Sequence, residues 1–200
     1  MLFPELNVFI DKNNFQGILT EALSSGPKWK DWPESHYGEG GNMDWKVFPF
    51  LHCFPASETD KMTWITKNCQ LCPNTSQLLE RLPGIRTALF SRMGPQTRIS
   101  SHRGWSDLAN DVLRCHICLK IPKNEEGDDF CGIWVEGQKR SHRNAEIVVF
   151  DDSKLHKAFN DSDEERIVLI IDLIRPGHIP KGTAKQGMTP ELEGLIAAYT

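Results

Sequence analysis

Two histidines have the placement of metal ligands. His102 and His156 each follow a stretch of strand-forming residues, and 54 residues separate them (156 minus 102). Before His156, the apolar run 147–150 predicts a buried strand, and the acids and serine at 151–153 predict a turn. Imidazoles on two different strands can converge on one ion of iron, zinc or copper and leave coordination positions open for a substrate. Packing, capping and proton transfer are the other roles open to a histidine at this place.

Three further polar residues lie on expected strands. The run VLRCHICLKI alternates so that Arg114 and His116 share one face, while the opposite face is apolar or thiol and belongs in a core. The polar face then either meets solvent or lines a site. Arg166 begins the run RIVLIIDLI, in which both faces are apolar, as in a strand covered on both sides. Such an arginine can bind a carboxylate through two parallel hydrogen bonds; an ion pair with Glu164 or Glu165 is the alternative.

Six cysteines include two C-x-x-C pairs, CQLC at 69–72 and CHIC at 115–118. This spacing permits a four-cysteine zinc site. The second pair, however, lies in an alternating strand, where positions i and i+3 point to opposite faces. Buried free thiols are therefore the favoured interpretation.

The composition describes an ordinary globular protein. The 200 residues carry a formal net charge of -4, with 39% hydrophobic residues, and suit one domain over 1–200. Scattered Lys and Arg residues argue against nucleic acid as a partner. No window holds 18 consecutive apolar residues, and the first residues lack a basic region, so we expect no membrane segment, no signal peptide and a cytoplasmic location.

The order of the expected elements predicts a jelly roll. Helices are expected over 14–25, over 72–84 with a cap near Asn74 or Thr75, and in the tail at 189–200. From residue 85 onward, short runs rich in Ile and Val alternate with polar turns such as KNEEGDD and DDS. Several short strands after helices predict a mainly β fold, a sandwich or jelly roll with a few helices packed outside.

Four segments, found across about 90–176, read FSRMGPQTRISSHRG, LRCHICLKIP, FDDSKLHKAFN and RIVLIIDLIRP. In sequence, order and spacing they resemble the aspartyl/asparaginyl β-hydroxylase family of Fe(II)- and 2-oxoglutarate-dependent oxygenases. A weaker match, MDWKVF and CPNTSQLLERLPG, extends over about 43–84, while 1–40 and 180–200 match little. The resemblance implies a double-stranded β-helix, the cupin-like form of the jelly roll.

The resemblance also implies roles for particular residues. Iron would be bound by two histidines, 2-oxoglutarate would be held at its distal carboxylate by the arginine of the last strand, and O2 would react at the iron. The H-x-D motif of most such enzymes ends here in Gly104, as in this family, where water takes the place of the acid. The implied site consists of the iron ligands His102 and His156, the cosubstrate residues Arg166, Arg114 and His116, and the pocket residues Ser91 and Trp45.

The implied reaction is a hydroxylation coupled to decarboxylation of 2-oxoglutarate to succinate and CO2. The expected acceptor is the β-carbon of an Asp or Asn side chain in a peptide or protein. The arginines with which the family holds this acceptor are missing at Gly40 and Val112, and Arg103 or Arg98 are the candidates to replace them. A free amino acid or a fatty-acyl chain is an alternative acceptor, and a non-catalytic zinc-binding or scaffold domain is the alternative of another class.

Overall fold

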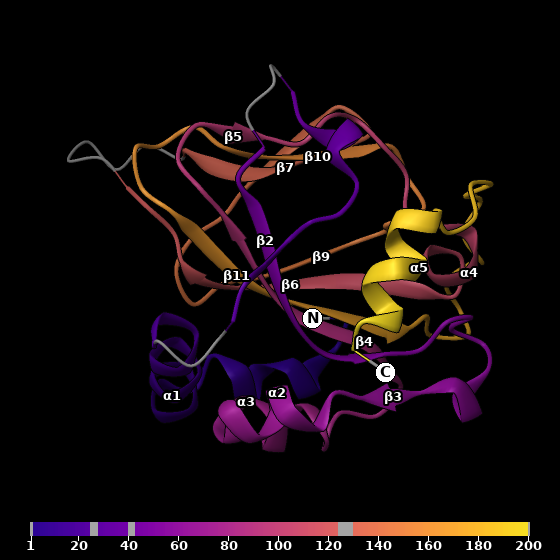
Figure 1. Cartoon of the computed structure of the whole chain (residues 1–200), viewed down its shortest axis with the longest axis horizontal. Coiled ribbons are helices and arrows are strands. Elements are labelled where there is room, and N and C mark those ends of the chain that lie inside the picture. The colour runs from indigo at the N-terminus through magenta and orange to yellow at the C-terminus, as the bar shows by residue number, and fades with distance from the viewer. Residues whose placement is uncertain (1, 25–27, 40–42, 124–129, 200) are drawn as a thin grey trace.

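The computed structural model describes residues 2–24, 28–39, 43–123 and 130–199, and within them two antiparallel sheets face each other (Figure 1). The larger sheet has the order β1-β2-β4-β11-β6-β9, with β3 paired to β2, and the smaller sheet has the order β5-β10-β7-β8. The strands of the larger sheet are β1 (Lys30–Asp31), β2 (Trp45–His52), β3 (Thr63–Trp64), β4 (Ile85–Met93), β6 (Val112–Lys120), β9 (Ile147–Phe150) and β11 (Arg166–Ile174). Those of the smaller sheet are β5 (Thr97–Arg98), β7 (Cys131–Val135), β8 (Gln138–Ser141) and β10 (His156–Asn160). The predicted mainly β jelly roll is confirmed.

Helices cover the outer face of the larger sheet (Figure 1). They are α1 (Lys12–Leu23), α2 (Thr66–Leu71) and α3 (Pro73–Leu79), preceded by a 3-10 turn at Pro4–Phe9. Two short 3-10 turns lie at Ser35–Tyr37 and Thr59–Lys61, and α4 (Ser106–Ala109) and α5 (Pro190–Ala197) lie together at one side of the jelly roll. None of the helices among the described residues is long and apolar enough to cross a membrane.

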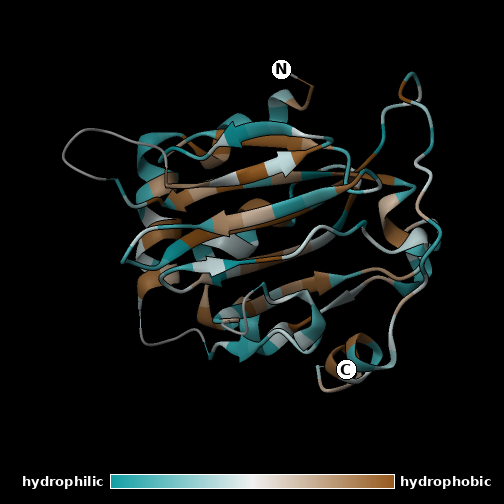
Figure 2. Ribbon diagram, turned by 90° about the horizontal axis from the view of Figure 1, so that it is seen from above, coloured by the Kyte–Doolittle hydropathy of each residue, from teal (hydrophilic) through white to brown (hydrophobic). Residues whose placement is uncertain are grey.

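The central strands separate two cores by simple alternation, visible as changing hydropathy along the ribbons in Figure 2. On β6, Cys115 and Ile117 point to the large core under the helices, whereas Cys118 belongs to a small cluster between the sheets. On β11, Leu169 and Ile171 pack on the helix side, and Val168 packs between the sheets. The polar residues of these strands on the Val168 face are therefore enclosed by the jelly roll, and Arg114 and His116 do not face solvent as an outer surface would.

The sequence located most elements but misjudged several boundaries. The helix expected over 72–84 is α3, which ends earlier, at Leu79, and α2 just before it was not predicted. The N-cap residue of α3 is Cys72, which makes no side-chain cap, so the cap is not Asn74 or Thr75. Asn74 and Thr75 instead donate to the carboxylate of Glu21 on α1. The helix expected at 14–25 begins at Lys12, after an Asp11 side chain that accepts from Asn13 N, and ends at Leu23. Residue 25, the expected end of this helix, lies outside the described residues.

Several strands were not predicted, β8 and β10 among them. β8 reads QKRS and has no apolar residue, and β10 reads HKAFN and begins at His156, after the turn expected at 151–153. The tail helix is confirmed as α5, with Thr189 as its N-cap.

Candidate active site

His102 and His156 are held side by side by their own backbones. The amide of each donates to the carbonyl of the other, at 2.9 Å in both directions, in an isolated antiparallel bridge. The two side chains therefore lie on the same face, and their ring centroids are 4.3 Å apart. A pair of hydrogen bonds between strands thus sets the spacing of the two imidazoles.

Each ring has one nitrogen committed to the backbone. Nδ1 of His102 lies 2.8 Å from the carbonyl of Ser100, and Nδ1 of His156 lies 2.8 Å from that of Lys154. A carbonyl only accepts, so each Nδ1 carries the proton and each Nε2 keeps its lone pair. Burial lowers the pKa of both histidines to about 4, so both rings are neutral at neutral pH. Neutral imidazoles with free lone pairs are the form that binds a metal ion.

Asp152 brings a carboxylate to the same place. Its Oδ1 lies 3.3 Å from Nε2 of His156, and its Oδ2 has no hydrogen-bond partner in the part of the chain that the structure describes, although the side chain is fully buried. Burial raises the pKa of Asp152 to about 6, against the opposing charge of Arg114. At neutral pH two acceptor atoms therefore face each other, which is unfavourable unless a cation lies beside both. This arrangement fits a metal ion at the histidine pair.

Arg114 is bound to two aspartates. Its Nη1 donates to Asp152 at 2.7 Å, and its Nε and Nη2 donate to Asp172 at 2.9 Å each. Asp172 also accepts a short hydrogen bond from Thr87. Burial alone would lower the pKa of Arg114, but the two carboxylates raise it. Arg114 therefore holds Asp152 in position, and its charge is balanced within the protein.

The charge of Arg166 is not balanced by a neighbouring carboxylate among the described residues. The side chain is 1% exposed, and its Nε and Nη1 have no hydrogen-bond partner among the described residues. The alternative ion pair is not formed by Glu165, which instead binds Arg92 at 2.5 Å and Lys120 at 3.2 Å.

Among the described residues, the ionisable groups that act on Arg166 are two thiols. Burial raises the pKa of the thiols of Cys118 and Cys131 to about 12 and 11, so both are neutral. Burial lowers the pKa of Arg166, but a guanidinium remains charged in proteins. A buried charge without a partner destabilises the folded protein by roughly several kcal/mol. Binding of an anion beside the charge removes this free-energy cost. The site of Arg166 fits a carboxylate.

One cavity between the sheets collects the residues that the sequence singled out. It is lined by Trp45, Ser91, Ile99, His102, Arg114, His116, Ile133, Phe150, His156, Ala158, Arg166 and Ile170. All seven residues expected at the iron and cosubstrate site are among them. Nε1 of Trp45 donates to Oγ of Ser91 at 3.0 Å, which links β2 to β4 at the edge of this cavity.

Three members of this region were missed in the sequence. From the sequence, Asp152 was assigned only to a turn. The turn is made by Asp151, whose Oδ1 accepts from Ser153 N at 3.0 Å. His142 follows β8 and lies with its Nε2 3.4 Å from Nδ1 of His116; burial lowers the pKa of both rings well below the usual value. Asp172 could have been recognised from the sequence. It is an acid in a strand expected to be buried, on the same face as Arg166, and a buried acid requires a hydrogen-bond partner.

Arg103 lies outside this cavity. It is exposed at the rim of an adjoining groove, and its Nη1 donates to the carbonyl of Ser153 at 2.9 Å. Arg98 pairs with Asp161 at 2.7 Å and does not line either space. Val112 is fully buried in a small core with α4 and α5, and Gly40 lies outside the described residues.

The cysteine pairs do not form a metal site in the part of the chain that the structure describes. No group of three or more His, Cys, Asp or Glu side chains is arranged there to hold an ion. All six cysteines are free thiols, and Cys115 and Cys118 lie in different cores, as the alternation of their strand predicted.

Comparison with known proteins agrees with this geometry. The family model described as Aspartyl/Asparaginyl beta-hydroxylase matches residues 12–176. An ornithine lipid ester-linked acyl 2-hydroxylase from Rhizobium tropici is 34% identical over 132 residues, which are 66% of this chain and 42% of that protein. The human aspartate beta-hydroxylase domain-containing protein 2 is 31% identical over 179 residues, 85% of this chain and 45% of that protein. The chain thus spans less than half the length of either relative.

A solved structure shares the fold. The crystal structure of an oxidoreductase of the 2OG-Fe(II) oxygenase family from Burkholderia pseudomallei matches with a TM-score of 0.54 and 12% identity, over 83% of this chain and 80% of that one. At this identity the likeness shows the double-stranded β-helix fold alone. The match of the family model over most of the sequence shows more: the chain belongs to the aspartyl/asparaginyl β-hydroxylase family.

Proposed function

We propose that this protein is an Fe(II)- and 2-oxoglutarate-dependent dioxygenase that hydroxylates a C–H bond. The single observation that carries the proposal is the cavity in which a neutral histidine pair and an unpaired buried arginine lie together. The first suits a metal ion and the second a carboxylate, and the reaction that the family resemblance implies uses both.

Six residues of the cavity have a proposed task. His102 and His156 would hold Fe(II) through Nε2, since Nδ1 of each is bonded to a backbone carbonyl. Arg166 would bind the distal carboxylate of 2-oxoglutarate, because its Nε and Nη1 are buried without a hydrogen-bond partner among the residues that the structure describes. Ser91, positioned by Trp45, and His116 would contact the same cosubstrate.

The charges of the site support this assignment. Arg114, Asp152 and Asp172 together carry one negative charge when all are ionised, and Arg166 balances it. A divalent cation and a dicarboxylate then enter as a neutral pair, which limits the cost of burial. When bound, iron, O2 and 2-oxoglutarate would supply the oxidation; the protein binds, orients and keeps water away.

Anaerobic titration tests the proposal. Fe(II) and 2-oxoglutarate are added to the protein, and a visible charge-transfer band of the chelated keto acid is expected. His102→Ala and His156→Ala should abolish the band and lower the iron content. Arg166→Met should give the band only at a much higher concentration of 2-oxoglutarate. A wild-type protein that gives no band at saturating concentrations, and forms no succinate in air, would overturn the assignment.

The acceptor has several candidates. The family resemblance favours the β-carbon of an Asp or Asn side chain in a peptide or protein, and a free amino acid is a related possibility. The relative from Rhizobium tropici is named for hydroxylation of a lipid acyl chain, so a fatty-acyl acceptor is the third. The choice among them depends on the groove that leads to the site.

A further inference from the structure

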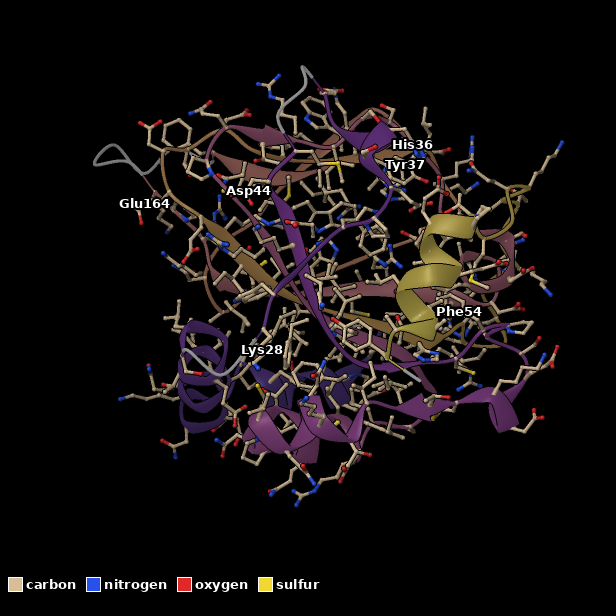
Figure 3. All side chains as sticks on the ribbon, in the orientation of Figure 1. Lys28, His36, Tyr37, Asp44, Phe54 and Glu164 are labelled. Carbon is tan, nitrogen blue, oxygen red and sulfur yellow. The ribbon has the colours of Figure 1, made fainter. Side chains whose placement is uncertain are left out.

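A pair of buried imidazoles links the two sheets beside the candidate cosubstrate site. Side chains of both sheets meet in the interior of the jelly roll (Figure 3). There, Nδ1 of His116 lies 3.4 Å from Nε2 of His142, with the ring planes 63° apart, and both side chains are buried. One hydrogen bond between the two rings therefore joins the larger sheet to the smaller one.

The backbone of each imidazole is held by its own sheet. His116 lies in the middle of β6, opposite Ile170 of β11 and Val148 of β9. His142 directly follows β8, and its amide donates to the carbonyl of Cys131 on β7 at 2.9 Å. Strand pairing thus sets the distance between the rings, and the pair is formed before a ligand binds.

The two rings differ in their access to the cavity. His116 lines it together with Arg114 and Arg166, whereas His142 is not among the described residues that do so. Nε2 of His116 has no hydrogen-bond partner in the described chain and is not fully enclosed by protein, so it is open to the cavity. His142 lies behind His116 and can influence a ligand only through it.

Both rings are uncharged, so each carries a single proton. Burial and the positive charge of Arg166 lower the pKa of His142 well below its usual value, and burial and His142 do the same for His116. A neutral imidazole has one N–H and one bare nitrogen. The hydrogen bond between the rings holds one proton, and the ring that supplies it decides what Nε2 of His116 presents to the cavity.

The two proton positions have opposite consequences for an anion. If Nδ1 of His116 donates, its Nε2 is bare and turns a lone pair toward a bound carboxylate. If Nε2 of His142 donates, Nδ1 of His116 accepts, and its Nε2–H points into the cavity. Nδ1 of His142 has no hydrogen-bond partner among the described residues, so that atom does not distinguish the two arrangements. A carboxylate only accepts, so the second arrangement alone suits an anion held by Arg166.

We propose that His142 is a positioning residue for the cosubstrate: it donates from Nε2 to His116 and fixes the tautomer whose Nε2–H faces the distal carboxylate beside Arg166. The inference rests on the proposed function, and His142 lies outside the four segments of the family resemblance. Arg166 balances the charge of the carboxylate, and the neutral pair adds a directed hydrogen bond. Such a bond favours a carboxylate over an apolar group at the same place.

Nuclear magnetic resonance tests the tautomer directly. The protein is labelled with nitrogen-15 in its histidines, loaded with Zn(II), which is not paramagnetic, and saturated with 2-oxoglutarate at neutral pH. Protonated and bare ring nitrogens have different chemical shifts, and variants that lack one histidine assign the signals. We expect the proton on Nε2 in both His116 and His142. A proton on Nδ1 of His116 would overturn the inference.

Two substitutions of His142 test its effect on binding in the anaerobic titration with Fe(II). His142→Phe keeps an aromatic ring but removes the donor, and should require about tenfold more 2-oxoglutarate, as loss of one hydrogen bond to a charged group does. His142→Gln places an amide N–H near the position of Nε2 and should restore most of the affinity. His178→Phe removes an exposed imidazole and should bind like wild type. Equal weakening by His142→Phe and His142→Gln would contradict the donor role.

A second keto acid separates positioning from a general effect on the fold. 2-Oxopentanoate has the same five-carbon chain and chelating group as 2-oxoglutarate but lacks the distal carboxylate. His142→Phe should weaken 2-oxoglutarate and leave 2-oxopentanoate unchanged. An equal loss for both keto acids would show that the substitution disturbs the whole site, and the inference would fall.

The inference and the proposed function can fail separately. If wild type gives the charge-transfer band but carries the proton on Nδ1 of His116, the inference fails and the oxygenase stands. If no band appears, but 2-oxoglutarate-bound protein shows the proton on Nε2 of His116 and His142→Phe binds 2-oxoglutarate more weakly, the oxygenase fails. The carboxylate site with His142 then stands.

Discussion

Asp152 occupies the space into which a side chain at position 104 would project. A Cβ built on Gly104 would overlap Oδ2 of Asp152 and approach Cβ of Ala109 to 2.8 Å. The backbone amide of Gly104 donates to the carbonyl of Asp152 at 2.8 Å, so the two chain segments are fixed against each other. Gly104 thus stands where the H-x-D motif usually has its acid. The carboxylate of Asp152, which comes from the connection between β9 and β10, fills the space beside it.

Substitution of Gly104 should therefore damage the protein. We expect Gly104→Ala to lower the free energy of unfolding by about 1–3 kcal/mol, as overpacking does, and to reduce succinate formation by displacing Asp152. Gly104→Asp should be worse, because it adds a second buried acid. Chemical unfolding and a succinate assay measure both effects. Gly187→Ala, where an added Cβ meets nothing within 4 Å, is the control. A Gly104→Asp variant more active than wild type would show that the acid is needed.

Arg166 should contribute to cosubstrate binding and not to stability. Arg166→Met removes an unpaired buried charge, so the ligand-free variant should be as stable as wild type or more stable. Loss of a charge-assisted bidentate interaction, about 1.5–3 kcal/mol, should raise the 2-oxoglutarate requirement roughly ten- to hundred-fold. Thermal unfolding with and without 2-oxoglutarate measures both quantities. Arg92→Met, which breaks the ion pair with Glu165, the residue before Arg166, should leave the requirement unchanged.

The metal-free protein should lose stability as the pH falls from about 7 to 4. Burial lowers the pKa of five histidines in the folded state: His52, His102, His116, His142 and His156. Between the folded and unfolded pKa values the unfolded chain binds more protons, so stability rises with pH, by up to about 1.4 kcal/mol per pH unit for each such group. Burial raises the pKa of Asp152 to about 6, so this residue makes the folded protein more stable as the pH falls. It is one group, and the five histidines outweigh it.

Urea unfolding in the presence of a chelator, at pH 7, 6 and 5, checks this dependence. His142→Phe removes one of the buried imidazoles and should flatten the curve. A free energy of unfolding that increases toward pH 5 would contradict the neutral state of these rings.

Glu21 should be the strongest polar contributor to the docking of α1. Its carboxylate accepts hydrogen bonds from the amide and side chain of Asn74, at 2.7 and 2.8 Å, and from those of Thr75, at 2.9 and 2.6 Å. Glu21→Gln replaces an acceptor oxygen by a donor that faces these groups, and should cost about 2–4 kcal/mol. Urea unfolding measures the loss. Glu193→Gln, exposed on α5, is the control, and an equal effect of both variants would remove the special role of Glu21.

Local alternation and motif spacing were enough for much of the site. The alternation of VLRCHICLKI assigned Arg114 and His116 to one face, and the apolar faces of the last run placed Arg166 at the start of a strand covered on both sides; the structure confirms both placements. Periodicity is a property of neighbouring residues, so a single sequence displays it. It could not show whether the polar face of β6 meets solvent or a cavity, since that depends on the sheet packed opposite.

The sequence by itself thus determined the jelly roll, the histidine pair and the arginine of the last strand. Tertiary structure alone decided that Asp152 fills the space beside Gly104, that Arg114 is bound to Asp152 and Asp172, and that α5 walls a groove with Trp32. These contacts join segments 38, 48, 58 and about 160 residues apart, as the pairs 114–152, 104–152, 114–172 and 32–192 show. Strand register and helix docking set such distances, and no local pattern in the chain encodes them.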